Sequence, residues 1–148
     1  PRRVTALART DAHLARVPVA ALRALLAGAP QWWRVIGTSA LEYGDITVAA
    51  YGDMLIQDTT RRCAAALLRL SGLRSPRRAR LELASAPVTR SELATLVNVS
   101  RATLVPILKR LESAGLLEQG YRVIRIRDAA RLQTMVFGDA APTESPGA

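Results

Sequence analysis

The sequence is poor in the residues that build disulfides, metal sites and catalytic dyads. Its 148 residues include one cysteine, Cys63, and one histidine, His13. A single cysteine excludes an internal disulfide and is typical of a reducing compartment, so we expect a cytoplasmic protein. The sequence shows no Cys/His metal spacing, no glycine-rich phosphate loop and no nucleophile beside a plausible base. These absences argue against an enzyme and predict no cofactor or metal in this chain.

Long apolar runs are also missing. No uninterrupted apolar stretch reaches the ~18 residues of a membrane span, and no signal peptide is visible, so we expect no membrane partner. With 49% hydrophobic residues the chain can nevertheless bury a core. Cys63, within an Ala- and Leu-rich segment, is expected to be a small core residue.

Acidic residues are scarce, and the excess of positive charge is concentrated in one part of the chain. The sequence has 21 Lys and Arg against 12 Asp and Glu, a net charge of +9. Residues 74–127 hold 11 basic and 4 acidic residues, so +7 of this charge lies there. This balance favours a polyanionic partner such as nucleic acid. The arginine-rich run at 74–80 alone fits a solvated loop equally well.

Residues 88–116 carry a helix-turn-helix pattern. Thr89 followed by Glu92 predicts a capping box that starts a short helix, and Asn98 suits the turn after it. Ser100 is then placed to cap a second helix. The apolar side of that helix comprises Leu104, Ile107, Leu108 and Leu111. The alternative is a pair of ordinary amphipathic helices within a bundle.

The segment after these helices predicts a basic β-hairpin. We expect its turn at Gln119-Gly120 and its second strand from Tyr121 to Arg127, where β-branched residues alternate with arginines. A hairpin beside the second helix makes a winged helix-turn-helix, in which the projecting helix start, at Arg101, enters the major groove. The hairpin is expected to hold the phosphate backbone. Tyr121-Arg122 would begin its second strand.

The first 28 residues predict two strands and a short helix. Strands are expected at Val4 to Ala8 and His13 to Val17, around a turn. Pro18 at the first helical position would then open a helix through Leu26, which Gly28 would close. His13 has no second ligand nearby and is expected to be an ordinary surface or strand residue.

A long helix is expected from about Gln31. Small and apolar residues recur along it at three- and four-residue steps, although three glycines weaken it by roughly 1 kcal/mol each. We interpret this stripe as the seam of a parallel homodimer; the alternative is packing within its own chain. The seam residues are Ile36, Ala40, Thr47, Tyr51 and Met54. After a hinge near Gln57, Asp58 is expected to cap a further helix to Leu70.

These parts, in this order, resemble the Crp/Fnr family of bacterial transcription regulators. The resemblance covers about residues 2–136 and is strongest at Asp58-Thr59-Thr60-Arg61-Arg62 and Val99-Ser100-Arg101. It implies a mainly α fold with a small β part, in a chain that looks like part of a longer regulator. The implied divisions are a sensor β-roll remnant (1–28), a dimerisation helix (29–57), a winged helix-turn-helix (58–136) and a disordered tail (137–148).

The resemblance also implies roles for individual side chains. Arg101 matches the arginine that reads guanine through two parallel hydrogen bonds. The positions matched to phosphate contacts or to setting the register on DNA are Thr89, Arg90, Ser100, Thr103, Lys109 and Gln119, with Arg122 of the hairpin. The sequence departs from the family at Ala102, where Glu is common, and at Pro106, where an arginine often stands. Pro106 removes a backbone donor and is expected to bend the helix. The operator sequence therefore cannot be inferred from the operators of relatives.

For effector sensing the resemblance is weaker. Arg2 and Thr47 match positions that bind cyclic nucleotide in some members, but Arg3-Val4 replaces the Ser-Ala of that segment. The effector of the intact protein is left open. The function predicted is a sequence-specific regulator that binds a palindromic operator as a homodimer, with double-stranded DNA and a second copy as partners and RNA polymerase as a further candidate. The alternative is a winged-helix module that binds only protein.

Overall fold

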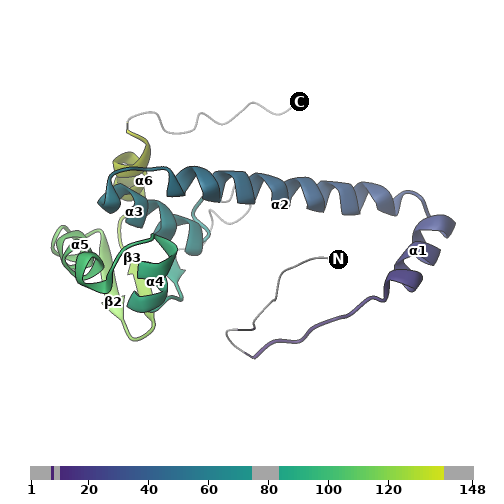
Figure 1. Cartoon of the computed structure of the whole chain (residues 1–148), viewed down its shortest axis with the longest axis horizontal. Helices are drawn as coiled ribbons and strands as arrows, with labels where there is room; N and C mark the ends of the chain where they lie inside the picture. Colours follow the sequence, from purple (N-terminus) through teal and green to yellow (C-terminus); the bar gives the residue numbers. More distant parts are fainter. Residues whose placement is uncertain (1–7, 9–10, 75–83, 139–148) are drawn as a thin grey trace. The chain divides into compact units, whose positions relative to one another are not determined.

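The computed structural model describes residue 8, residues 11–74 and residues 84–138 (Figure 1). Within them the chain forms mostly helices with one small sheet, which confirms the predicted fold class. The elements are α1 (Val19–Gly28), α2 (Trp32–Met54), α3 (Thr59–Leu70), β1 (Ser85–Ala86), α4 (Arg90–Leu96), α5 (Arg101–Ser113), β2 (Leu117–Gly120), β3 (Val123–Ile126) and α6 (Ala129–Phe137). The backbone divides into two compact units, residues 1–44 and 45–148, with the boundary inside α2.

The strand expected at His13 to Val17 is wrong. Residues 11–18 have no regular secondary structure and their side chains are exposed. A strand is held by hydrogen bonds to a neighbouring strand, and the described part of this unit offers none. The other expected strand, Val4 to Ala8, lies outside the described residues except for Ala8. The helix that follows is confirmed, but Pro18 is its N-cap rather than its first residue. It also continues through Gly28, which was expected to close it, and its C-cap is Ala29.

The long helix is confirmed as α2, which runs without interruption through three glycines. A Cβ atom added at Gly37, Gly44 or Gly52 would meet nothing within 4 Å. Among the described residues, these glycines therefore serve no close approach between helices. Large apolar side chains of α2 are exposed, including Tyr43, at 72%.

Helix α3 forms as its sequence predicts. The Asp58 carboxylate accepts a hydrogen bond from the Arg61 amide at 2.7 Å, and Gly72, with φ +78°, lies beyond the last turn. Cys63 on this helix is fully buried, and burial raises the pKa of its thiol to about 12. Its interpretation as a core residue is confirmed.

The helix-turn-helix is also confirmed, cap by cap. Thr89 and Glu92 form the predicted capping box of α4. Asn98 takes the left-handed backbone conformation, with φ +53°, that the tight turn requires. The Ser100 hydroxyl accepts a hydrogen bond from the Thr103 amide at 3.0 Å and so caps α5. All four apolar residues predicted for the inner side of α5 are buried.

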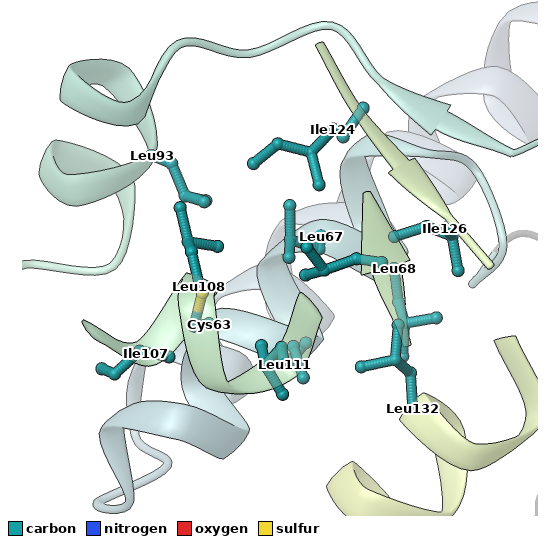
Figure 2. Close-up of a cluster of buried hydrophobic side chains, with 14 of the residues drawn as sticks. Cys63, Leu67, Leu68, Leu93, Ile107, Leu108, Leu111, Ile124, Ile126 and Leu132 are labelled. Carbon is teal, nitrogen blue, oxygen red and sulfur yellow. The ribbon is translucent and has the colours of Figure 1, made fainter. Parts of the chain in front are cut away.

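One core holds the helices of this unit against the sheet (Figure 2). Leu67 and Leu68 of α3 lie among Leu93 of α4, Leu108 of α5 and Ile124 of β3. Each of these five side chains is at most 3% exposed. Full burial of a Leu or Ile side chain stabilises the fold by about 1.5–3 kcal/mol, so these contacts fix how the helix-turn-helix sits on the sheet.

The sheet has the order β1-β3-β2, and both pairings are antiparallel. The hairpin turn predicted at Gln119-Gly120 is wrong: Gly120 pairs with Val123, and the turn consists of Tyr121 and Arg122. Gly120 is required for space, because a Cβ atom there would lie 2.9 Å from Cγ1 of Val123. Arg122, with φ +56°, supplies the positive backbone angle of the turn.

Two elements were not predicted. β1 is two residues long and extends the sheet by pairing with β3. α6 is capped by Asp128, whose carboxylate accepts from the Arg131 amide at 2.9 Å, and it packs on α3 through Leu132 and Val136. Phe137, which was expected in the tail, ends α6, and the rest of that tail, apart from Gly138, lies outside the described residues.

Candidate nucleic-acid interface

A groove of about 460 Å³ lies where the starts of α4 and α5 meet the hairpin. Arginines from three elements line it: Arg90 begins α4, Arg101 begins α5, and Arg122 lies in the hairpin turn. The remaining lining residues are Val88, Thr89, Ser91, Gln119, Gly120, Tyr121 and Ile124. The lining therefore contains three cations and no carboxylate, which suits an anionic ligand.

A chain of hydrogen bonds ties the hairpin to both helices of the motif. Arg90 donates from Nε to Oε1 of Gln119 at 3.0 Å. Gln119 in turn donates to the carboxylate of Glu112 twice, from its backbone amide at 2.8 Å and from its side-chain amide at 2.7 Å. These two bonds, with a smaller contribution from the Arg90 charge, lower the pKa of Glu112. The groove is thereby held by side chains from α4, α5 and β2.

The start of α5 presents a free cation. Arg101 is exposed, and among the described residues it makes no hydrogen bond or ion pair. It follows Ser100, whose hydroxyl is 2.8 Å from that of Thr103. Ser100 and Thr103 are exposed but do not belong to the groove lining, so they stabilise the helix start without forming part of the groove.

The hairpin is less basic than its sequence predicts. Arg125 and Arg127 both form ion pairs with Glu118, the first at 3.4 Å. Arg122 has no such partner within the described part of the chain. Beside it, Tyr121 is 91% exposed at the tip of the hairpin. The tip therefore offers one cation and one aromatic ring.

Five of the eight residues predicted to contact DNA line the groove together: Thr89, Arg90, Arg101, Gln119 and Arg122. Lys109 is exposed on α5, two turns beyond Arg101 and outside the groove. Sequence reasoning missed Ser91 and Tyr121. A correct placement of the hairpin turn would have identified Tyr121, because turn residues at a hairpin tip are the most exposed.

Two residues were considered for effector binding. Arg2 lies outside the described residues, and Thr47 is on α2. The described ranges contain no cluster of three or more His, Cys, Asp or Glu side chains able to hold a metal ion. None of the helices in these ranges is both long and apolar enough to cross a membrane.

Comparison with known protein families identifies the helix-turn-helix. A Crp-like helix-turn-helix domain matches residues 61–135, which include most of α3, the motif, the hairpin and most of α6. The chain belongs to the Crp/Fnr family of transcription regulators. Membership in this family makes it a DNA-binding regulator rather than an enzyme.

Solved Crp/Fnr-family structures share the fold. A transcriptional regulator of the CRP family from Thermus thermophilus is 21% identical with a TM-score of 0.53, over 81% of this chain and 55% of that one. A Crp/Fnr-family regulator from Eubacterium rectale is 18% identical with a TM-score of 0.52, over 80% of this chain and 52% of that one. The chain thus spans about half the length of these relatives. A comparison with curated protein sequences found no match.

Proposed function

We propose that this Crp/Fnr-family chain is the DNA-reading part of a sequence-specific regulator that binds a palindromic operator as a homodimer. The observation that carries the proposal is the meeting of Arg90, Arg101 and Arg122 in one groove without a carboxylate. The family resemblance implies an effector-sensing domain ahead of α2, and we propose that the intact regulator has such a domain.

The groove fits duplex DNA in two ways. The start of α5 projects beside it, which is the part of a recognition helix that meets base edges in the major groove. Arg90 of α4 and Arg122 of the hairpin flank the start of α5. In a complex they would lie near the phosphates on either side of the DNA major groove. Arg101 is then the side chain placed to read a base, and the two flanking arginines are placed to hold the backbone.

Helix α2 supports the homodimer. Within the single chain Tyr51 is 67% exposed and Met54 is 42% exposed, so these two residues of the predicted seam present apolar surface to solvent. A second copy packed on these side chains would remove apolar surface from water. Two copies would also present two recognition helices to half-sites about 34 Å apart, the spacing of one helical turn.

Selection of bound sequences from random duplex DNA tests the proposal directly. We expect one enriched palindrome, with log affinity falling steeply against log salt concentration because cations displace counterions from phosphates. Arg122→Ala should reduce the salt slope by about one. Arg131→Ala, which removes the same charge from α6 outside the groove, is the matched control and should leave the slope unchanged. Equal slopes for all three proteins would exclude the groove as the DNA site.

Sedimentation equilibrium tests the assembly separately. The chain should be dimeric, and Met54→Glu should shift it to monomers, because two carboxylates would face each other across a parallel seam. Thr103→Glu adds the same charge to α5 and should not change the mass. A monomer at every concentration of the unmodified protein would contradict the homodimer.

A further inference from the structure

The outermost ridge of α5 is apolar over its first two turns. The buried side chains of α5 are Leu104, Ile107, Leu108 and Leu111. At about 3.6 residues per turn, the ridge directly opposite this buried face comprises Ala102, Pro106, Lys109 and Ser113. All four are exposed. The first two, nearest the start of the helix, have only a methyl group and a pyrrolidine ring to offer a ligand.

Arg101 lies to one side of this ridge. It lines the groove with Gln119 and Arg122 and so faces the hairpin. A helix that enters the major groove places its outermost ridge against the bases, so Ala102 and Pro106 would lie nearer the floor of the DNA groove than Arg101. Neither side chain can form a hydrogen bond with a base edge.

The cations around the ridge determine which ligand it meets. Arg101 stands before it, Lys109 follows Pro106 on the same ridge, and Arg122 lies across the groove. An apolar strip only two residues long that is flanked by exposed cations is complementary to a polyanion that carries small apolar groups. Duplex DNA has one such group in its major groove, the C5 methyl of thymine.

We propose that Ala102 and Pro106 are specificity-determining residues that contact thymine methyl groups. Each operator half-site would then be defined by thymines next to the base that Arg101 reads. This inference rests on the proposed function and adds to it the chemical feature of the DNA that is recognised. Recognition of a methyl group requires no hydrogen bond from Ala102 or Pro106.

Replacement of thymine by uracil in the duplex obtained by selection tests this directly. Uracil keeps every hydrogen-bonding group of thymine and lacks only the methyl. Each contacted thymine that is replaced should weaken binding about fourfold, the factor that corresponds to removing one buried methyl group. Uracil placed outside the half-sites should leave affinity unchanged.

Two variants connect the effect to the residues. Pro106→Ala retains a helical backbone and removes most of the apolar ring. The ratio of the affinities for the thymine duplex and the uracil duplex should therefore fall towards one at a single position of each half-site. Ser113→Ala, further along the same ridge, is the matched control and should preserve every ratio. Ala102→Glu introduces an acceptor for the cytosine amino group, and selection with this variant should replace one thymine by cytosine.

The outcomes distinguish this inference from the proposal beneath it. An enriched palindrome whose affinity is insensitive to uracil at all half-site positions would overturn the thymine contacts and leave the proposed function standing. Enrichment of no sequence at all would refute the proposed function, and the inference would fall with it. Sensitivity to uracil that persists equally in Pro106→Ala and in Ala102→Glu would assign the methyl contacts to other side chains.

Discussion

Replacement of Arg62 by methionine should destabilise the helix-turn-helix unit by about 2–4 kcal/mol, the loss expected for two charge-assisted hydrogen bonds in part-buried surroundings. Arg62 lies on α3 and joins two segments that are distant in the sequence. Its Nε donates to the carbonyl of Val97, at the end of α4, at 2.9 Å. Its Nη1 donates to the carbonyl of Ile56, in the link between α2 and α3, at 2.5 Å. One guanidinium therefore holds the turn of the motif and the link that leads into it.

The magnitude follows from the two carbonyls. A hydrogen bond to a charged group contributes about 1.5–3 kcal/mol, and most is lost when the remaining partner stays buried. Val97 is fully buried, so its carbonyl cannot easily turn to water instead. Ile56 is half-buried, and its carbonyl can regain part of the loss from solvent. Methionine keeps much of the apolar stem of the arginine, so lost packing adds little.

Urea denaturation followed by circular dichroism measures this loss as a shift of the midpoint at constant slope. Arg62→Lys is the matched control: its ammonium keeps the charge but lacks the planar fork that serves both carbonyls, so it should recover about half of the stability. An Arg62→Met protein within about 0.5 kcal/mol of the unmodified one, the range of an ordinary surface substitution, would show that the bridge contributes nothing.

Three further predictions concern the site. Arg101→Ala should cost about 1–3 kcal/mol on a selected duplex and relax the preference for one guanine, whereas Lys109→Ala should weaken all duplexes alike and lower the salt slope by about one; equal losses on selected and random DNA would make Arg101 a phosphate contact. Gly120→Ala should cost about 1–3 kcal/mol in urea denaturation, because the added Cβ would be 2.9 Å from Cγ1 of Val123; an unchanged midpoint would contradict the close packing. The pKa of Glu112 is lowered below its ordinary value in the folded protein, so the stabilisation from Glu112 is present above the pKa of the unfolded chain and is lost as pH falls through the folded pKa. The difference in stability between the protein and Glu112→Ala should shrink in this acidic range, and a constant difference would refute the linkage.

The parts of the fold that the sequence predicted correctly depend on contacts between near neighbours. The capping box of Thr89, the cap at Ser100 and the cap at Asp58 each join residues three apart, so the residue types alone predict them. The apolar face of α5 repeats at helical spacing and could be recognised in the same way. Asp128 caps α6 by the same local rule, so this helix too could have been predicted from its sequence.

The errors concern strands, whose limits depend on partners elsewhere. The hairpin turn lies at Tyr121-Arg122 because Gly120 pairs with Val123, and this register is supported by the pairing of β3 with β1. β1 itself has only two residues, too few for an alternating pattern to be recognised in the sequence. The strand expected at His13 to Val17 does not form, because no partner strand lies beside it in the described residues.

Composition alone overstated the positive charge available to DNA, because several arginines form ion pairs within the protein. Arg69 and Arg74 both bind the buried carboxylate of Asp53, near the end of α2. In the hairpin, Arg125 and Arg127 share Glu118, a pairing that could not be foreseen because Glu118 and Arg125 face each other only in the observed register.

The cations that remain unpaired are the ones that matter for recognition. Arg61 and Arg62 donate to backbone carbonyls, and Arg110 donates to the hydroxyl of Thr60 at 2.8 Å. Arg101 and Arg122 keep their donors for a ligand, because within the described ranges neither has a protein partner. Residues 74–127 have a net charge of +7, but in the described part of this segment only a few cations around the start of α5 are free to bind a ligand. An interface with so few free cations depends for its specificity on the shape and apolar character of that helix, which is why Ala102 and Pro106 are the positions at which a change of residue should change the DNA sequence that is bound.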